Sequence, residues 1–220
     1  MNKEILNVKY SKGEEIFNMV THIVGSTVGI AALTLGIIIS SINFNGYSLA
    51  SSIAFGIAII LVYVISSIYH GLKPNTTGKK VFRILDHAMI FVLIAGTYTP
   101  FALCLLREYN LVIGWTMFGV VWLLALIGII FSAISIEKFK LIFTLCYHLI
   151  GWCIVFKIDV LFKLLTPLGF IIVSVGGILY LIGSLIYIIG KEKKWLHSVM
   201  HIFMVLGTSA HIVSVLLFVL

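Results

Sequence analysis

Charged residues are scarce in this chain. Asp, Glu, Lys and Arg make up only 10% of its 220 residues, against about 25% in soluble domains. Hydrophobic residues make up 61%, and a soluble protein of this size has too much surface for its volume to hide them all from water. The composition therefore excludes a cytosolic enzyme, a nucleic-acid-binding protein and a disordered chain.

Cysteine is scarce too, which excludes a disulfide scaffold. The three cysteines (Cys104, Cys146 and Cys153) all lie inside apolar runs, and none belongs to a CxxC motif. We therefore interpret them as small buried hydrophobic residues. A cleavable signal peptide is also lacking, because no small-residue cleavage site follows a short apolar core. We expect the first apolar segment to stay in place as a membrane anchor.

Long apolar runs are what the chain has in abundance. Each is close to the roughly 20 residues that a membrane-spanning helix needs, and none alternates as a barrel strand would. We predict an all-α polytopic membrane protein, with residues 1–220 forming a single seven-helix domain. The spans are expected at approximately 17–42, 48–72, 82–106, 110–134, 139–157, 167–190 and 195–220.

The distribution of Lys and Arg predicts how the bundle is oriented. Twelve of the 15 fall before the first span or in the loops on that same side, whereas Arg107, Lys157 and Lys163 fall on the other. Positive residues near span ends favour the cytoplasmic side. We expect a multi-pass protein of the cell membrane with a cytoplasmic N-terminus and an extracytoplasmic C-terminus.

Polar residues within the spans gather at the expected cytoplasmic end. They come from four spans that are distant in sequence: Glu15, Asn18 and His22, then Ser66 and His70, then Asp86 and His87, and finally His197 and His201. Ionisable residues in a membrane are costly, so each is a candidate functional residue.

The spacing of these residues indicates a metal site. His197 and His201 are four residues apart, so both rings share one helix face, and His70 can supply a third nitrogen. Three histidines with one open position are typical of a catalytic zinc site, where a bound water has its pKa lowered to about 7. Asp86 could bind that water or orient a histidine. Ser66 could polarise a substrate carbonyl.

Each feature also has a structural interpretation. Two histidines four residues apart can simply pack, and Asp86 could pair with Arg83 or cap a helix start. Glu15, Asn18 and His22 could form a hydrogen-bond cluster between helices. Because all of them fall on one membrane face, we favour the metal site.

Two further histidines are assigned supporting positions. His211 shares a face with His201 but lies roughly 15 Å deeper by helical rise, so it either lines an inner cavity or is buried and hydrogen-bonded. His87 is about 100° around the helix from Asp86 and is expected to pack or to support the site.

Together these residues form motifs that resemble the hemolysin III family, the bacterial branch of the progestin and adiponectin receptor (PAQR) superfamily. The matching stretches are Glu15-x2-Asn18-x3-His22, Ser66-x3-His70, Arg83-x2-Asp86-His87, the run from Ile94 to Phe101, and His197-x3-His201-x9-His211. The resemblance implies a seven-helix bundle holding one zinc ion on the residues matching His70, His197 and His201. It also implies that Asp86 contacts the zinc-bound water.

The resemblance carries functional implications as well. Members of the wider superfamily look like lipid amide hydrolases acting on ceramide-type substrates. The bacterial branch takes its name from haemolysis and is tied to membrane-lipid homeostasis. This chain differs from the eukaryotic receptors in lacking an N-terminal soluble region and in carrying His87 beside Asp86, so receptor function is not expected.

Three hypotheses follow. The first is a zinc-dependent hydrolase of lipid amide or ester bonds, ceramidase-like, whose lipid substrate enters between helices. The second is a membrane sensor or regulator in which zinc is structural. The third is a pore-forming or cytolytic activity, although seven uncleaved spans could not travel through water as a secreted toxin. Neither nucleic acid nor a soluble protein partner is expected.

Overall fold

The computed structural model describes residues 10–134, 136–190 and 193–220, with the side chains of 136–141 excepted. Lys3, Lys9 and Lys191, which contributed to the predicted orientation, lie outside this part. The described residues are helical and contain no strand, which confirms the predicted fold class. Seven helical stretches are long and apolar enough to cross a membrane: Lys12–Ile42, Gly46–Gly71, Thr77–Tyr109, Leu111–Ile134, Ile142–Leu164, Pro167–Ile189 and Leu196–Phe218.

The individual elements follow the chain in a simple order. They are α1 (Lys12–Ile42), α2 (Gly46–Gly71), α3 (Thr77–Pro100), the π-helix η2 (Phe101–Leu106), α4 (Arg107–Tyr109), α5 (Leu111–Ile134), α6 (Ile136–Gly151), the 3₁₀ turn η3 (Cys153–Lys157), α7 (Ile158–Leu164), α8 (Pro167–Ile189) and α9 (Leu196–Phe218).

Local sequence explains where several helices begin. Ser11 and Glu14 form a capping box at the start of α1, in which each side chain accepts from the backbone N–H of the other residue. Asn45, Thr76 and Thr166 cap α2, α3 and α8 by accepting from backbone N–H groups in the first turn. Polar caps therefore mark boundaries that hydropathy places only approximately.

The third and fifth spans are longer than predicted. The third starts at Thr77, directly after its cap, and continues past Pro100 as the π-helix and α4. Proline lacks an N–H and disturbs the regular hydrogen-bond ladder, which accounts for the change of register there. In the fifth span the stretch from Lys157 to Lys163, predicted as a break, falls largely within α7.

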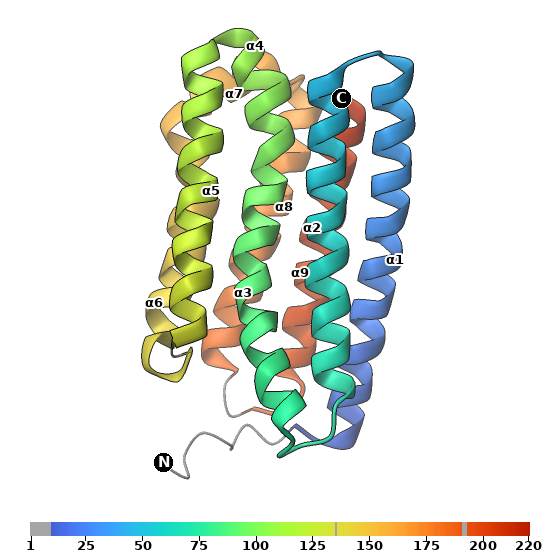
Figure 1. Cartoon of the computed structure of the whole chain (residues 1–220), viewed down its shortest axis with the longest axis vertical. Coiled ribbons are helices and arrows are strands. Elements are labelled where there is room, and N and C mark those ends of the chain that lie inside the picture. Colours follow the sequence, from blue (N-terminus) through green and yellow to red (C-terminus); the bar gives the residue numbers. More distant parts are fainter. Residues whose placement is uncertain (1–9, 135, 191–192) are drawn as a thin grey trace.

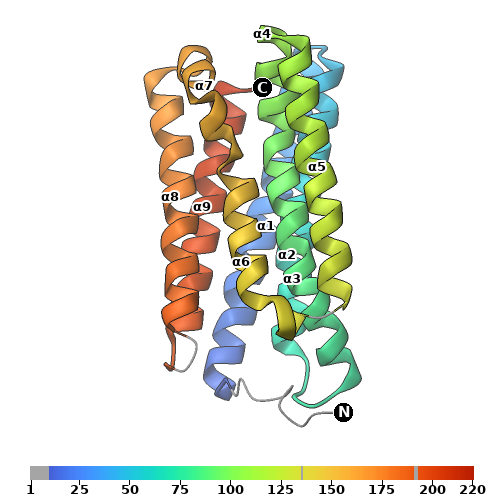
Figure 2. The ribbon, with the colours of Figure 1, turned by 90° about the vertical axis from the view of Figure 1, so that its left-hand side faces the viewer.

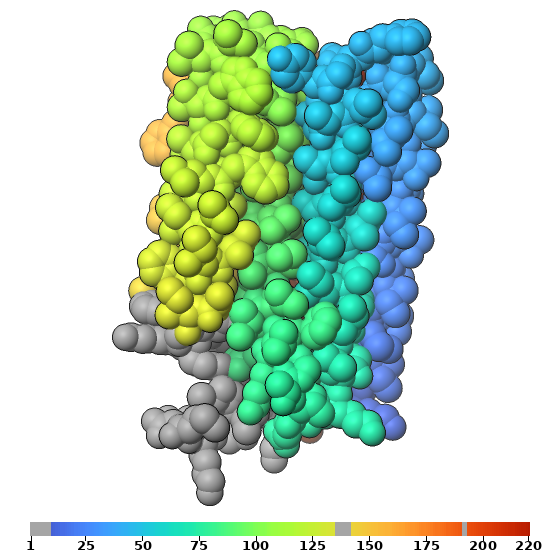
Figure 3. Space-filling model, viewed as in Figure 1, coloured from blue at the N-terminus to red at the C-terminus, as the bar shows by residue number. Residues whose placement is uncertain are grey.

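The helices pack as an upright bundle with α3 near its centre (Figures 1 and 2). In the most apolar window of each span, 72% of the residues are buried for the stretch containing α3 but only 11% for α8. The space-filling view shows α3 set back between α5 and α2 (Figure 3). Helix α1 begins at one end of the bundle, and α9 ends at the other (Figure 1).

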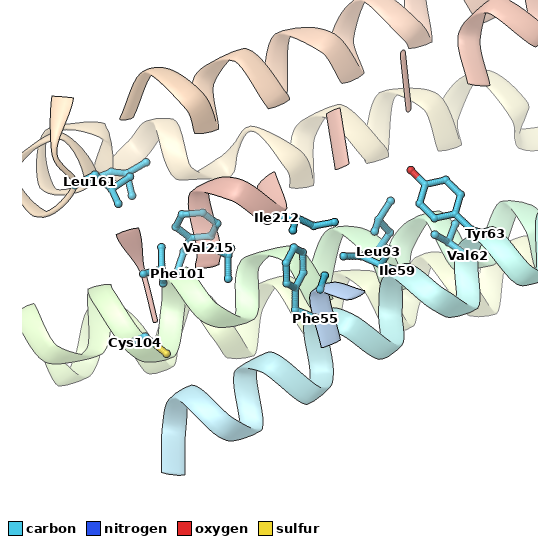
Figure 4. Close-up of a cluster of buried hydrophobic side chains, with 13 residues drawn as sticks. Phe55, Ile59, Val62, Tyr63, Leu93, Phe101, Cys104, Leu161, Ile212 and Val215 are labelled. Atoms are coloured by element: carbon cyan, nitrogen blue, oxygen red, sulfur yellow. The ribbon is translucent and has the colours of Figure 1, made fainter. Parts of the chain in front are cut away.

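Apolar side chains from several spans meet in the interior. Phe55 of α2, Leu93 of α3 and Ile212 of α9 belong to one buried cluster (Figure 4). Close packing of α1 on α2 depends on small residues, as is common between membrane helices. At Gly29 an added Cβ would lie 2.7 Å from the side chain of Ile59. This core holds the ends of α1, α2, α3 and α9 in a fixed relation.

Candidate metal centre

Three histidines from two helices converge near the end of the bundle where α1 begins. One ring nitrogen from each of His70, His197 and His201 can be chosen so that all three lie within 4.8 Å of one another. The Nε2 atoms of His197 and His201 are 2.9 Å apart. The Nε2 atom of His70 is buried and has no hydrogen-bond partner among the described residues. This group could hold a metal ion.

Glu15 orients the ring of His70. Its Oε2 atom accepts a hydrogen bond from Nδ1 of His70 at 2.7 Å, which leaves the Nε2 lone pair free. The other carboxylate oxygen, Oε1, accepts from Nζ of Lys79 at 2.9 Å, and Lys79 also lies over the ring of Tyr69, 4.4 Å from its centroid. A carboxylate bound to the second nitrogen of a histidine is the usual support of a metal ligand.

His22 has the corresponding position beside His201. Its Nε2 atom contacts Nδ1 of His201, and both rings are buried. If Nδ1 of His201 carries the proton, Nε2 of that ring presents its lone pair towards His197. Asn18 lies one turn before His22 and is fully buried, and its amide makes no hydrogen bond within the described part of the chain. Of the predicted trio, Glu15 and His22 thus contact two of the three histidines.

Tyr10 covers the outer side of the cluster. Its ring stacks on that of His197, with centroids 4.6 Å apart and an interplanar angle of 20°. Burial is the main factor that raises the pKa of the Tyr10 hydroxyl, with smaller contributions from Tyr69 and from the charge of Asp86. The hydroxyl therefore stays protonated, and the aromatic ring covers one face of His197.

A cavity of about 290 Å³ extends from the cluster into the bundle. His197, His201, Ser66 and Asp86 line it at the histidine end, and most of the remaining wall is apolar. Ser66 is buried, and its hydroxyl has no partner among the residues described. The structure thus brings Ser66, Asp86, His197 and His201 to the wall of one largely apolar cavity.

His87 and Asp86 lie side by side on this wall. His87 Nδ1 is 3.7 Å from Oδ2 of Asp86 and 3.0 Å from the backbone oxygen of Arg83. Tyr147 of α6 donates to the backbone oxygen of His87 at 2.9 Å. His87 therefore packs beside Asp86 on the cavity wall.

His211 lies apart from the cluster, deeper in the same cavity. It lines the wall and its ring stacks on Tyr180, with centroids 5.4 Å apart. Of the two alternatives considered for it, lining an inner cavity agrees with the structure, and Nδ1 makes no hydrogen bond to any described residue.

Sequence reasoning missed two residues of the centre. Tyr10 precedes the first helix, where no periodicity marks it. Lys79 is one of the basic residues that the sequence places in a loop, although it lies in the first turn of α3. Only their tertiary contacts distinguish these two residues, because tyrosines and basic residues are both common at the ends of membrane helices. Without these contacts, Lys79 would be only one of the basic residues that indicate how the protein is oriented in the membrane.

Comparison with known proteins agrees with the motifs. A family described as haemolysin-III related matches residues 10–212. Hemolysin-3 of Bacillus cereus is 37% identical over 207 residues, covering 94% of this chain and 92% of that protein. A Hemolysin-3 homolog of Bacillus subtilis (strain 168) is 36% identical over 205 residues, covering 93% and 94%. The chain belongs to the hemolysin III family.

Proposed function

We propose that this protein is a membrane-embedded zinc hydrolase that cleaves amide or ester bonds of lipids. The observation that carries the proposal is the meeting of His70, His197 and His201 at the end of a largely apolar cavity that Asp86 and Ser66 also line. An apolar cavity suits an acyl chain, and polar groups at one end suit its head.

The donor set fits zinc. Three imidazoles with one open position are a familiar catalytic zinc environment, with Zn–N bonds of about 2.0–2.1 Å. One nitrogen from each ring lies within 4.8 Å of the other two, so a single ion between the rings could be bound by all three. A zinc ion held there would polarise the scissile carbonyl and lower the pKa of a water. Glu15 and His22 would keep the rings of His70 and His201 in the required tautomer and orientation.

Asp86 and Ser66 would supply the proton acceptor and the hydrogen-bond donor that the hydrolysis also needs. Asp86 would accept a proton as water attacks the carbonyl carbon, and would return it to the leaving nitrogen as the C–N bond breaks. Proton uptake and release by one carboxylate balance, so the products are a fatty acid and an amine. The Ser66 hydroxyl, free of other partners in the described part, would donate to the carbonyl oxygen.

The setting of the cavity favours a substrate drawn from the bilayer. We propose a multi-pass protein of the cell membrane, linked to membrane-lipid homeostasis, with the metal centre near the cytoplasmic face. Lys12, Lys79 and Lys194 stand at the ends of the helices that form the centre, and positive residues favour the cytoplasmic side.

Turnover by purified protein tests the proposal. Zinc-loaded protein in nanodiscs is incubated with an N-acyl sphingoid base and with a phospholipid, and released fatty acid is quantified. We expect release from at least one substrate and a loss of about 100-fold or more in Asp86→Asn with the metal retained. Zinc binding without turnover across such substrates would instead support a sensor or regulator with structural zinc.

The relatives' name favours a second candidate, lysis of membranes. Proteins similar to this chain are called Hemolysin-3, so dye leakage from liposomes is the matching assay. Leakage that His70→Ala leaves unchanged would indicate a pore independent of the metal centre. Leakage that disappears with turnover would indicate that lysis follows from lipid hydrolysis.

A further inference from the structure

The deep end of the cavity contains two buried polar groups with no role in the proposed chemistry. His211 on α9 and Thr97 on α3 both line the cavity, and each is only 9% exposed. Nδ1 of His211 and Oγ1 of Thr97 have no hydrogen-bond partner among the described residues. A buried polar atom without a partner is destabilising, so such atoms call for an explanation.

His211 is held in place although it makes no hydrogen bond to any described residue. Its ring stacks on Tyr180 at an interplanar angle of 18°. The Nε2–Cδ2 edge faces Gly176, where an added Cβ would lie 2.9 Å from both atoms. The glycine thus leaves room for this edge of the ring against α8, and Nδ1 is on the ring's other edge. A fixed ring with a free nitrogen is suited to binding.

Thr97 differs from other threonines of the bundle. Thr21, Thr34, Thr99 and Thr208 each donate to the backbone carbonyl four residues earlier. Thr97 makes no such bond within the part of the chain described. Thr97 lines the cavity, and its hydroxyl has both its donor and its acceptor capacity unused within the described part of the chain.

The other polar groups nearby are already satisfied. The hydroxyl of Thr208 lies 2.6 Å from that of Tyr63 and 2.7 Å from that of Tyr180. The hydroxyls of Tyr63 and Tyr180 both bind that of Thr208, so none of the three is a hydrogen-bond partner of His211 or Thr97. Neither group has a partner within the described part of the chain, and a bound ligand could supply one.

Both free groups lie at a similar depth below the metal centre. His211 is ten residues beyond His201 on α9, and Thr97 is eleven beyond Asp86 on α3, and the two helices run in the same direction (Figure 1). A rise of about 1.5 Å per residue places them roughly 15 Å deeper. An extended acyl chain with its head at the histidines reaches that depth after about twelve carbon–carbon bonds.

From these observations we infer that His211 and Thr97 form a second polar subsite, which binds a hydroxyl group near the middle of the ligand's acyl chain. A hydroxyl both donates and accepts, so it can pair with Thr97 Oγ1 and with His211 Nδ1. The inference rests on the proposed function, because it assumes a lipid head at the metal centre. It adds a substrate class: hydroxyacyl lipids with the hydroxyl close to carbon 12.

Equilibrium binding of three fatty acids tests this subsite without requiring turnover. The probes are octadecanoic, 12-hydroxyoctadecanoic and 2-hydroxyoctadecanoic acid, each displacing a fluorescent fatty acid from the full-length, zinc-loaded protein. We expect the 12-hydroxy acid to bind about 5- to 10-fold more tightly than octadecanoic acid, as one or two good hydrogen bonds allow. The 2-hydroxy acid should gain no such advantage.

Two variants and a matched control locate the effect. Thr97→Val removes only the hydroxyl, and His211→Phe keeps a ring to stack on Tyr180. Both should lose the 12-hydroxy preference while still binding octadecanoic acid. Thr34→Val is the control, because Thr34 is exposed on α1 and bonds its own helix at Ile30; it should retain the preference.

The outcomes separate this inference from the hydrolase proposal. Equal binding of the three acids would overturn the subsite, and so would a preference that survives both variants. Either result would indicate that water is the partner of the two groups. Failure to bind any of the acids would overturn it as well. Turnover of the unsubstituted substrate is measured independently. A 12-hydroxy preference that persists in catalytically inactive Asp86→Asn would support the subsite by itself.

Discussion

Nδ1 of His70 on α2 lies 2.7 Å from Oε2 of Glu15 on α1, across 55 residues of sequence. The hydrogen bond fixes which nitrogen of His70 faces the cluster, since the proton on Nδ1 leaves Nε2 as the lone-pair donor. It also ties the start of α1 to the end of α2. Metal affinity should therefore depend on a residue that need not touch the metal.

Substituting Glu15 tests this dependence. In Glu15→Gln the charge is lost and Lys79 loses its ionic partner, so we expect zinc affinity to fall about 10- to 100-fold. Competition with a fluorescent chelator measures the dissociation constant. Glu14→Gln is the matched control, because Glu14 instead accepts from Ser11 and from the backbone of Trp195. Equal affinities in the two variants would contradict the assigned role of Glu15.

Removing a ligand should remove the metal itself. We expect His197→Ala and His201→Ala to purify without stoichiometric zinc, because two remaining imidazoles bind weakly. Elemental analysis of the purified protein gives the ratio. His148→Ala should keep its metal, since His148 bonds Ser184 at 2.6 Å and is not one of the three clustered histidines. Unchanged zinc in all three variants would exclude the proposed ligand set.

Zinc should also stabilise the fold. A ligand that binds only the native state adds about 2.7 kcal/mol at 100 times its dissociation constant, and this ligand set joins α2 to α9. A chelator should therefore lower the melting temperature of the wild type, measured by intrinsic fluorescence. His201→Ala should melt at the same lower temperature with or without chelator. A wild type that does not respond would show that the site is empty or energetically unimportant.

Two glycines of α5 should differ in their tolerance of a methyl group. An added Cβ at Gly114 would overlap the backbone of Arg107, whereas one at Gly119 would meet nothing within 4 Å. Gly114→Ala should cost about 1–3 kcal/mol through overpacking. Gly119→Ala should stay within about 0.5 kcal/mol of wild type. Thermal unfolding of both variants in one detergent compares them, and similar melting temperatures would argue against close packing of α4 on α5.

Helix number could be predicted because hydropathy is a local property. A run of about 20 apolar residues must span the bilayer as a helix whatever its neighbours do. The boundaries at Thr77 and Leu164 escaped prediction for the opposite reason. Helix starts depend on caps such as Thr76, and charged residues such as Lys163 can continue a helix at its end.

The sequence by itself determined that His197 and His201 share a helix face, because spacing along a helix is set by its geometry. Tertiary structure alone decided that His70 meets these two histidines. It also decided that Glu15 binds His70 and Lys79 binds Glu15, and that Tyr10 stacks on His197. The depth of His211 could be calculated from the sequence, but its place with Thr97 on the wall of one cavity could not. The reason is physical: lipid-facing helices look alike in hydropathy, and only the fit of their small and large side chains sets which helices become neighbours.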